Sequence, residues 1–205
     1  MANADRPSGL SPARYLNGAP WNGAGNVYCI PNTDDSLAYA IGDPVTLAGS
    51  ADANGIPTIT LATAGTGNSV LGAIVATNAS KFGGQYGVPA SDPIVIPVTK
   101  TKDYYVLVCD DPNVIFEIQE VSGGTALTAA EVGLNANLVS GTNNGYVSGW
   151  ELNNSGEAVT ATLQLRSYGS RLGPITLSAS MPSGMCSSTT ICTESAKWAC
   201  KGDLK

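Results

Sequence analysis

The side chains of this sequence that could do acid–base chemistry are carboxylates in adjacent pairs. Asp34 is followed by Asp35, and Asp110 by Asp111. Adjacent residues of a strand point to opposite faces, so neither pair could share a proton there. In a loop such residues cap turns, and the proline that follows Asp111 favours that interpretation. We therefore expect both pairs to be structural.

Other catalytic chemistry has little support. The chain contains no histidine, which removes imidazole bases and most catalytic zinc sites. It has no nucleophile elbow, phosphate loop or dinucleotide motif. Residues 52–55, Asp-Ala-Asn-Gly, resemble the start of a calcium loop without its closing glutamate, so a weak structural cation is the alternative there. We predict that the chain is not an enzyme and binds no metal or cofactor.

The five cysteines fall into two groups. Cys29 and Cys109 each stand alone in an apolar run, and a lone cysteine of this kind is usually a small buried hydrophobe. The other three crowd near the end of the chain with no zinc-like spacing: Cys186, Cys192 and Cys200.

Charge and hydropathy exclude several partners. The net charge of −6 argues against direct binding of nucleic acid. No apolar run approaches the roughly 20 residues of a membrane helix. The first residues lack the apolar core of a signal peptide, so we expect synthesis in a cytosol. Residues 1–169 hold 14 acidic and 6 basic side chains and residues 170–205 hold 2 and 4, which marks the last segment as different.

Many short β-type runs, separated by Gly, Asn, Asp and Pro turn signals, occupy residues 26–169. This pattern predicts an all-β body, a jelly-roll-like β-sandwich or a barrel, with no linker inside it. One helical turn is predicted at 128–132, where Thr128 and Glu131 fit a capping box. Strands are expected at 26–30, 38–47, 57–62, 69–77, 93–98, 103–110, 113–119, 132–139, 145–152 and 158–167.

Residues 1–25 predict an extended arm, because their three prolines exclude a helix or a central strand. Its apolar residues are too many for a segment that meets only water. The arm could contact a neighbouring subunit, or it could pack on its own domain. We expect five of its side chains to bind a partner: Arg6, Leu10, Arg14, Tyr15 and Trp21.

Four segments together resemble a known group. Residues 3–10, Asn-Ala-Asp-Arg-Pro-Ser-Gly-Leu, and 15–23, Tyr-Leu-Asn-Gly-Ala-Pro-Trp-Asn-Gly, resemble the opening of capsid decoration (cement) proteins of short-tailed bacteriophages. Residues 110–119 and 132–139 are similar too. The resemblance implies a protein on the outer surface of the virion capsid that binds the major capsid protein and itself, as a homodimer or homotrimer. It implies no catalytic residue.

Two alternatives stay open at this point. The chain could be another structural part of the virion, such as a head fibre or tail component. It could also be a carbohydrate-binding or adhesive β-sandwich, although no stripe of aromatic residues supports this. Residues 173–205 are expected to be a reading-frame variant of the family's usual ending. As written, they should lack the pattern to complete the core, so that their side chains fit poorly, lie exposed, or trace a strand whose apolar positions disagree with burial.

Overall fold

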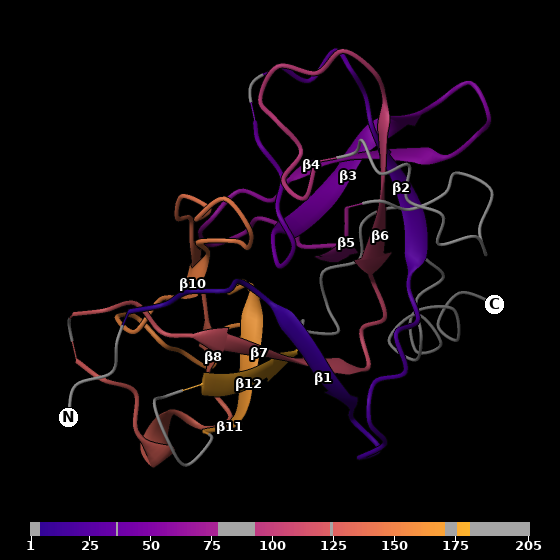
Figure 1. Cartoon of the computed structure of the whole chain (residues 1–205). Helices are drawn as coiled ribbons and strands as arrows, with labels where there is room; N and C mark the ends of the chain where they lie inside the picture. The colour runs from indigo at the N-terminus through magenta and orange to yellow at the C-terminus, as the bar shows by residue number, and fades with distance from the viewer. Residues whose placement is uncertain (1–4, 36, 78–92, 124, 171–175, 181–205) are drawn as a thin grey trace, which may run out of the picture.

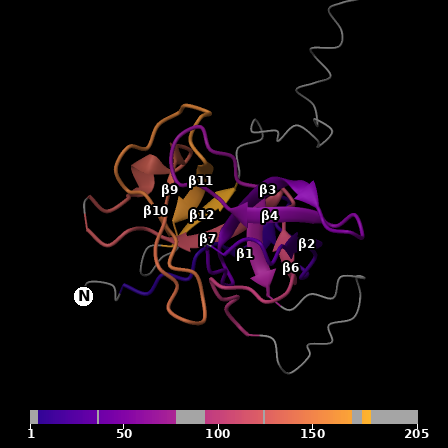
Figure 2. The ribbon, with the colours of Figure 1, turned by 90° about the horizontal axis from the view of Figure 1, so that it is seen from above.

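The computed structural model describes residues 5–35, 37–77, 93–123, 125–170 and 176–180 of the chain. Within these ranges the chain forms strands, one short 3-10 turn and no α-helix. The all-β class is therefore confirmed. The strands gather in two groups that lie side by side in both views (Figures 1 and 2).

The pairing of one group closes on itself. Its order is β2 (Asn26–Ile30), β4 (Pro57–Leu61), β3 (Pro44–Ala51), β5 (Gly72–Ala76) and β6 (Tyr104–Cys109), and β6 pairs back to β2. The β2–β4 link is parallel and the others are antiparallel. One apolar cluster is built from this group and the segments beside it, with Tyr39, Val45, Ile59, Ile74, Ile96 and Val106 among its buried members.

The second group is an antiparallel sheet in the order β1 (Ser11–Tyr15), β7 (Val114–Gln119), β12 (Thr176–Ser180), β11 (Leu165–Ser170) and β8 (Asn135–Ala136). A short pair, β9 (Leu138–Val139) and β10 (Glu151–Leu152), accompanies it. A second apolar cluster takes Ala73 and Cys109 from the first group and Phe116 and Leu165 from the sheet. The two groups of strands therefore share a core.

Five of the ten predicted strands and the helical turn occur where they were expected. The strands at 26–30, 57–62, 69–77, 103–110 and 113–119 are confirmed as β2, β4, β5, β6 and β7. The helical turn is the 3-10 segment Ala129–Glu131, capped by Thr128, and its capping box with Glu131 is present. Cys29 and Cys109 are buried as predicted, and burial raises the pKa of each thiol to about 11.

Five predicted segments differ from the structure, and two of them, 132–139 and 145–152, hold only the two-residue strands β8, β9 and β10. Residues 158–164 form a loop despite their alternation, and Val159 is 82 % exposed. That alternation predicts a strand only if a partner strand is available, and the regular pairing starts at Leu165. Residues 93–98 contribute a single bridge, from Ile96 to Tyr39. Residues 38–47 become a strand only from Pro44 onward.

Part of the C-terminal segment, residues 176–180, forms a strand, which is one of the outcomes expected for it. This stretch is β12, which pairs with β7 on one side and β11 on the other. Its alternating Thr-Leu-Ser-Ala-Ser sequence suits a paired strand. The three clustered cysteines and the remainder of the predicted reading-frame variant, residues 181–205, lie outside the described residues.

Candidate interaction surface

The N-terminal segment lies on its own domain and ends in a hairpin. β1 is an edge strand, which is where a proline such as Pro12 can be accommodated. The chain then turns back, because the Tyr15 N–H donates to the Ala19 carbonyl at 2.8 Å and the Trp21 N–H to the Ala13 carbonyl at 3.2 Å. We call residues 11–24 the N-terminal hairpin. In Figure 1 it forms the lower right corner of the molecule.

The hairpin is fixed by its own polar side chains. Gly18 has a φ of +89°, as the predicted Asn-Gly turn requires. The Tyr15 hydroxyl donates to Asn22 Oδ1 at 2.9 Å, and the Trp21 ring N–H to the Ala24 carbonyl at 3.2 Å. Both rings also pack partly against the shared core. The hairpin therefore presents a formed surface rather than a loose chain.

Of the five predicted partner residues, three lie together. Arg14, Tyr15 and Trp21 belong to the hairpin, with Arg14 exposed and the two aromatic side chains half-buried. Arg6 is also exposed, but its backbone N–H donates to Gln119 at the other end of β7. Leu10 is 1 % exposed inside the shared core. Leu10 is thus an anchor within its own chain, and we leave it out of the contact surface.

The sequence-based set of expected partner residues did not include Leu16. Its side chain is 44 % exposed at the tip of the hairpin. Its N–H donates to the Asn113 carbonyl at 2.7 Å, which holds the tip against the turn between β6 and β7. The signal was available, since Leu16 immediately follows Tyr15 next to an Asn-Gly turn.

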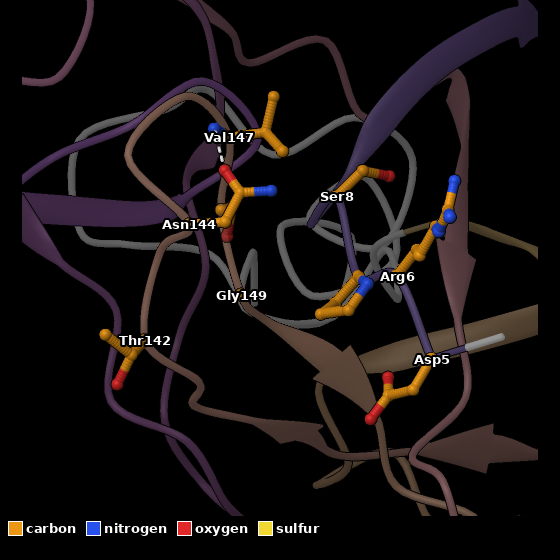
Figure 3. Close-up of a pocket in the computed structure, with 9 residues that line it drawn as sticks. Asp5, Arg6, Ser8, Thr142, Asn144, Val147 and Gly149 are labelled. Carbon is orange, nitrogen blue, oxygen red and sulfur yellow. Dashed lines mark hydrogen bonds between the residues drawn. The ribbon is translucent and has the colours of Figure 1, made fainter.

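A groove of about 430 Å³ lies between the N-terminal segment and the loop at 142–149. Figure 3 shows Asp5 and Arg6 on one side and Asn144 and Val147 on the other. The Asp5 carboxylate accepts hydrogen bonds from Gln119 and Ser122. Because Asp5 is already held in this way and no other described carboxylate lines the groove, the groove offers no acid–base pair.

Asp5, which lines the groove, interacts with a second carboxyl group, that of Glu151. Burial, and then the neighbouring Asp5, raise the pKa of Glu151 in β10. One carboxylate oxygen of Glu151 is buried without a hydrogen-bond partner. Protonation of Glu151 therefore removes the repulsion between its carboxylate and that of Asp5.

A close junction fixes the N-terminal segment just before the hairpin. The Leu10 N–H donates to the Gly42 carbonyl at 2.9 Å, and the Ser148 N–H to the Ile41 carbonyl at 2.8 Å. Gly9 has a φ of +66°, and a Cβ there would lie 2.2 Å from the Gly42 carbonyl oxygen. Only glycine fits this approach without moving the backbone.

A buried carboxyl lies at this junction. Asp43 is 3 % exposed and accepts the Ala40 N–H at 2.7 Å. Burial raises its pKa to about 6, and hydrogen bonds from Ser148 and the Ala40 backbone oppose the rise. Because the folded-state pKa lies above the unfolded value of 3.8, ionised Asp43 destabilises the folded chain.

The substitution Asp43→Asn should therefore change the pH dependence of stability. The contribution of wild-type Asp43 is fully present below about pH 4 and is lost as the pH rises through about 6, a total of about 3 kcal/mol. The amide cannot ionise, and its oxygen can still accept the Ala40 N–H. Urea unfolding from pH 4 to 7.5 should show the wild-type free energy of unfolding falling relative to the variant. Parallel curves would refute this role for Asp43.

A buried lysine joins the loop that follows β2 to the segment that precedes β6. Lys100 is 5 % exposed, and its ammonium donates to the carbonyls of Asp34, Leu37 and Val98, the last two at 2.8 and 3.1 Å. It also lies 5.2 Å over the Tyr39 ring. Desolvation lowers the Lys100 pKa, while the two aspartates of the 34–35 pair oppose this.

The acidic pairs have structural roles. Asp35 accepts the Lys100 N–H at 3.0 Å, and Asp34 accepts the Tyr39 hydroxyl. Asp111 accepts the Asn113 N–H at 2.8 Å, as predicted for a turn before proline. Asp110 accepts Asn26 and the Tyr28 hydroxyl.

The calcium-like segment is a capped turn. Asp52 accepts the backbone N–H groups of Asn54 and Ile56, both at 2.8 Å. The side chain of Asn54 is the main cause that lowers the Asp52 pKa. Among the described residues, no three potential metal ligands gather. No helix in the same part of the chain is long and apolar enough to span a bilayer.

Comparison with known proteins gives no match, so the role of this surface is inferred from its own residues. Neither a protein-family model, nor a curated protein, nor a solved structure matches the chain.

Proposed function

We propose that this chain is a capsid decoration (cement) protein of a tailed bacteriophage, bound to the outer surface of the major capsid shell. The observation that carries the proposal is the N-terminal hairpin, which presents Arg14, Tyr15, Leu16 and Trp21 at a corner of an all-β body. Arginine and aromatic residues dominate the energetics of protein interfaces.

The segments that resemble decoration proteins lie in or beside the hairpin, which supports this region as the contact surface. Residues 15–23 are the turn and return of the hairpin, and residues 110–119 are the adjoining turn and β7. Segments that are distant in sequence and similar to one family therefore meet at one surface. Residues 3–10, which include the Gly9 and Leu10 anchors, lead directly into it.

The polar groups of the body favour a structural role over catalysis. The buried Asp43 and Lys100 each bind backbone groups of neighbouring loops. Such groups specify loop positions when they are fully hydrogen-bonded. We propose that the protein acts without a catalytic site, metal or cofactor.

The finer fold forms part of the proposal. The closed pairing from β2 through β6 is consistent with a small barrel that carries the sheet β1-β7-β12-β11-β8 beside it. A continuous core between the two would let the body resist deformation. We propose this barrel-and-sheet body as the form that the predicted jelly-roll-like sandwich or barrel takes.

The mechanism is mechanical stabilisation. Packaged DNA pushes the capsid subunits apart, and a protein bound across their junctions adds an interface that must be lost before rupture. Many copies make a modest affinity collectively large. The partners are the major capsid protein and other copies of the chain, without direct contact to nucleic acid or membrane.

The number of copies per virion separates this function from the alternatives. A decoration protein should be present at on the order of hundreds of copies per particle, because it occupies repeated sites over the whole shell. Quantitative mass spectrometry of purified virions, with the major capsid protein as internal standard, gives this number. A count of a few to tens would instead indicate a head fibre or tail component. Absence from virions would favour an adhesive module outside the particle.

A further inference from the structure

Two carboxyl groups lie at opposite ends of the segment that leads into the hairpin. Residues 5–10, which we call the strap, begin along the groove shown in Figure 3. Glu151 of β10 lies against the first residue of the strap, Asp5. Asp43 lies at the other end, next to the carbonyl that binds Leu10. Burial is the main cause that raises the pKa of both Asp43 and Glu151.

The end of the strap is in direct contact with the surroundings of Asp43. The Leu10 N–H donates to the Gly42 carbonyl at 2.9 Å. A Cβ on Gly9 would lie only 2.6 Å from the Ser148 hydroxyl oxygen, so the strap backbone lies directly against this side chain. The same hydroxyl forms a hydrogen bond with Asp43. The strap therefore covers the group that holds the buried carboxyl.

Ionised Asp43 has no compensating cation at this place. Its side chain is 3 % exposed, and the groups that oppose the rise of its pKa are the Ser148 hydroxyl and the Ala40 N–H, both uncharged. A buried carboxylate without a cation favours any opening that lets water reach it. Movement of the strap away from Ser148 is such an opening.

The start of the strap meets a second unfavourable anion. One carboxylate oxygen of Glu151 is buried without a hydrogen-bond partner among the described residues. The charged residues of the neighbouring segments are Asp5, Arg6 and, at the end of β7, Glu120, and of these Asp5 acts on the Glu151 pKa. Asp5 cannot turn away freely, because Gln119 and Ser122 hold its carboxylate. Two adjacent carboxylates repel each other, whereas a neutral Glu151 can donate to Asp5.

We propose that the strap is a pH-sensitive device, closed on the body while Asp43 and Glu151 are neutral and opened locally when they ionise. Opening releases residues 5–10 and leaves β1 paired with β7, so the hairpin loses its support on one side only. This inference goes beyond the proposed function. It concerns the free protein, and it holds whether or not the chain binds a capsid.

The strap should be held most tightly in acid. Because the folded-state pKa of each group is raised, its stabilising contribution is fully present below the unfolded value and is lost as the pH rises through the folded value. For Asp43 these values are 3.8 and about 6, and Glu151 shifts in the same direction. The Asp43 shift alone sets an upper limit of about a hundredfold on the change in the opening equilibrium.

Hydrogen exchange of single amides, followed by NMR and corrected for the intrinsic effect of pH, measures the opening. Protection of the Leu10 amide should fall at least about tenfold between pH 5 and pH 8. The Tyr39 amide, bound to the Ile96 carbonyl at 3.0 Å in the first group of strands, is the reference. At pH 8 the Leu10 amide should exchange at least about tenfold faster than the Tyr39 amide, because a local opening exposes only the former.

Variants that cannot ionise identify the groups responsible. The double variant Asp43→Asn with Glu151→Gln should keep the Leu10 amide as protected at pH 8 as the wild type is at pH 5. Each single variant should retain part of the pH dependence. Glu120→Gln is the matched control, because it neutralises a nearby carboxyl and keeps an acceptor for the Leu127 N–H. Its pH profile should equal that of the wild type.

Three results would each overturn the inference. They are a Leu10 protection that does not change with pH, a double variant that keeps the wild-type dependence, and Leu10 and Tyr39 amides that exchange equally fast at every pH. If Asp43→Asn does not fold, the wild-type profile and Glu151→Gln still decide. Shell binding is a separate measurement: wild-type protein that binds no shell at either pH ends the proposed function, and the exchange result stands.

Discussion

Replacing Lys100 with methionine is expected to lower the free energy of unfolding by about 3–5 kcal/mol. Methionine keeps most of the apolar stem but removes the ammonium. The carbonyls of Asp34, Leu37 and Val98 then lose their donor, and all three belong to the loops that Lys100 joins. Buried polar groups without partners carry the full desolvation cost.

Lys102→Met is the matched control for this experiment. Lys102 is exposed and lies 5.3 Å over the Tyr104 ring, so its loss should cost less than about 1 kcal/mol. Urea unfolding of both variants at one pH gives the comparison. Equal losses for the two variants would show that the ammonium of Lys100 does not hold the loops.

Replacing Gln164 with leucine should lower the free energy of unfolding by a similar amount, about 3–5 kcal/mol. Gln164 is 1 % exposed and its amide serves four backbone groups. The nitrogen donates to the carbonyls of Thr63 and Asn68 at 2.8 and 3.3 Å. The oxygen accepts the N–H groups of Gly65 and Leu138, both at 3.0 Å. Leucine fills the space and satisfies none of them.

The same substitution at Gln119 is the control for Gln164→Leu. Gln119 is only half-buried, and it binds Arg6 N–H and Asp5 near water. Solvent can replace these bonds, so a loss below about 1 kcal/mol is expected. Hydrogen exchange should show faster opening of residues 63–68 in Gln164→Leu alone. Unchanged protection there would contradict the role of Gln164 as the link between this loop and β9.

The sequence predicted correctly the elements that follow a simple local pattern. The strands at 26–30 and 113–119 alternate or are continuously apolar, and the capping box at Thr128 is a local arrangement of four residues. The loop at 158–164 has the same alternation as a strand. It stays a loop because Gln164 turns inward to serve the 63–68 segment, and this contact is remote in the sequence.

The candidate surface could be predicted only in part. Composition and proline spacing indicated an arm with Arg14, Tyr15 and Trp21 as contact residues, and the structure brings these three together. The burial of Leu10 depends on its fit beneath the Gly42 junction, which needs the positions of two distant loops. The acidic turn beside Leu16 likewise comes from a segment about a hundred residues away.

Binding to expanded capsid shells that lack the protein tests the decoration function most directly. Purified chain should co-sediment with such shells until a fixed number of sites is filled, and filled shells should withstand higher temperature before rupture. Arg166→Glu should bind like the wild type, since it lies outside the hairpin. If saturating wild-type protein neither sediments with the shells nor raises their rupture temperature, the chain is not a decoration protein of that capsid.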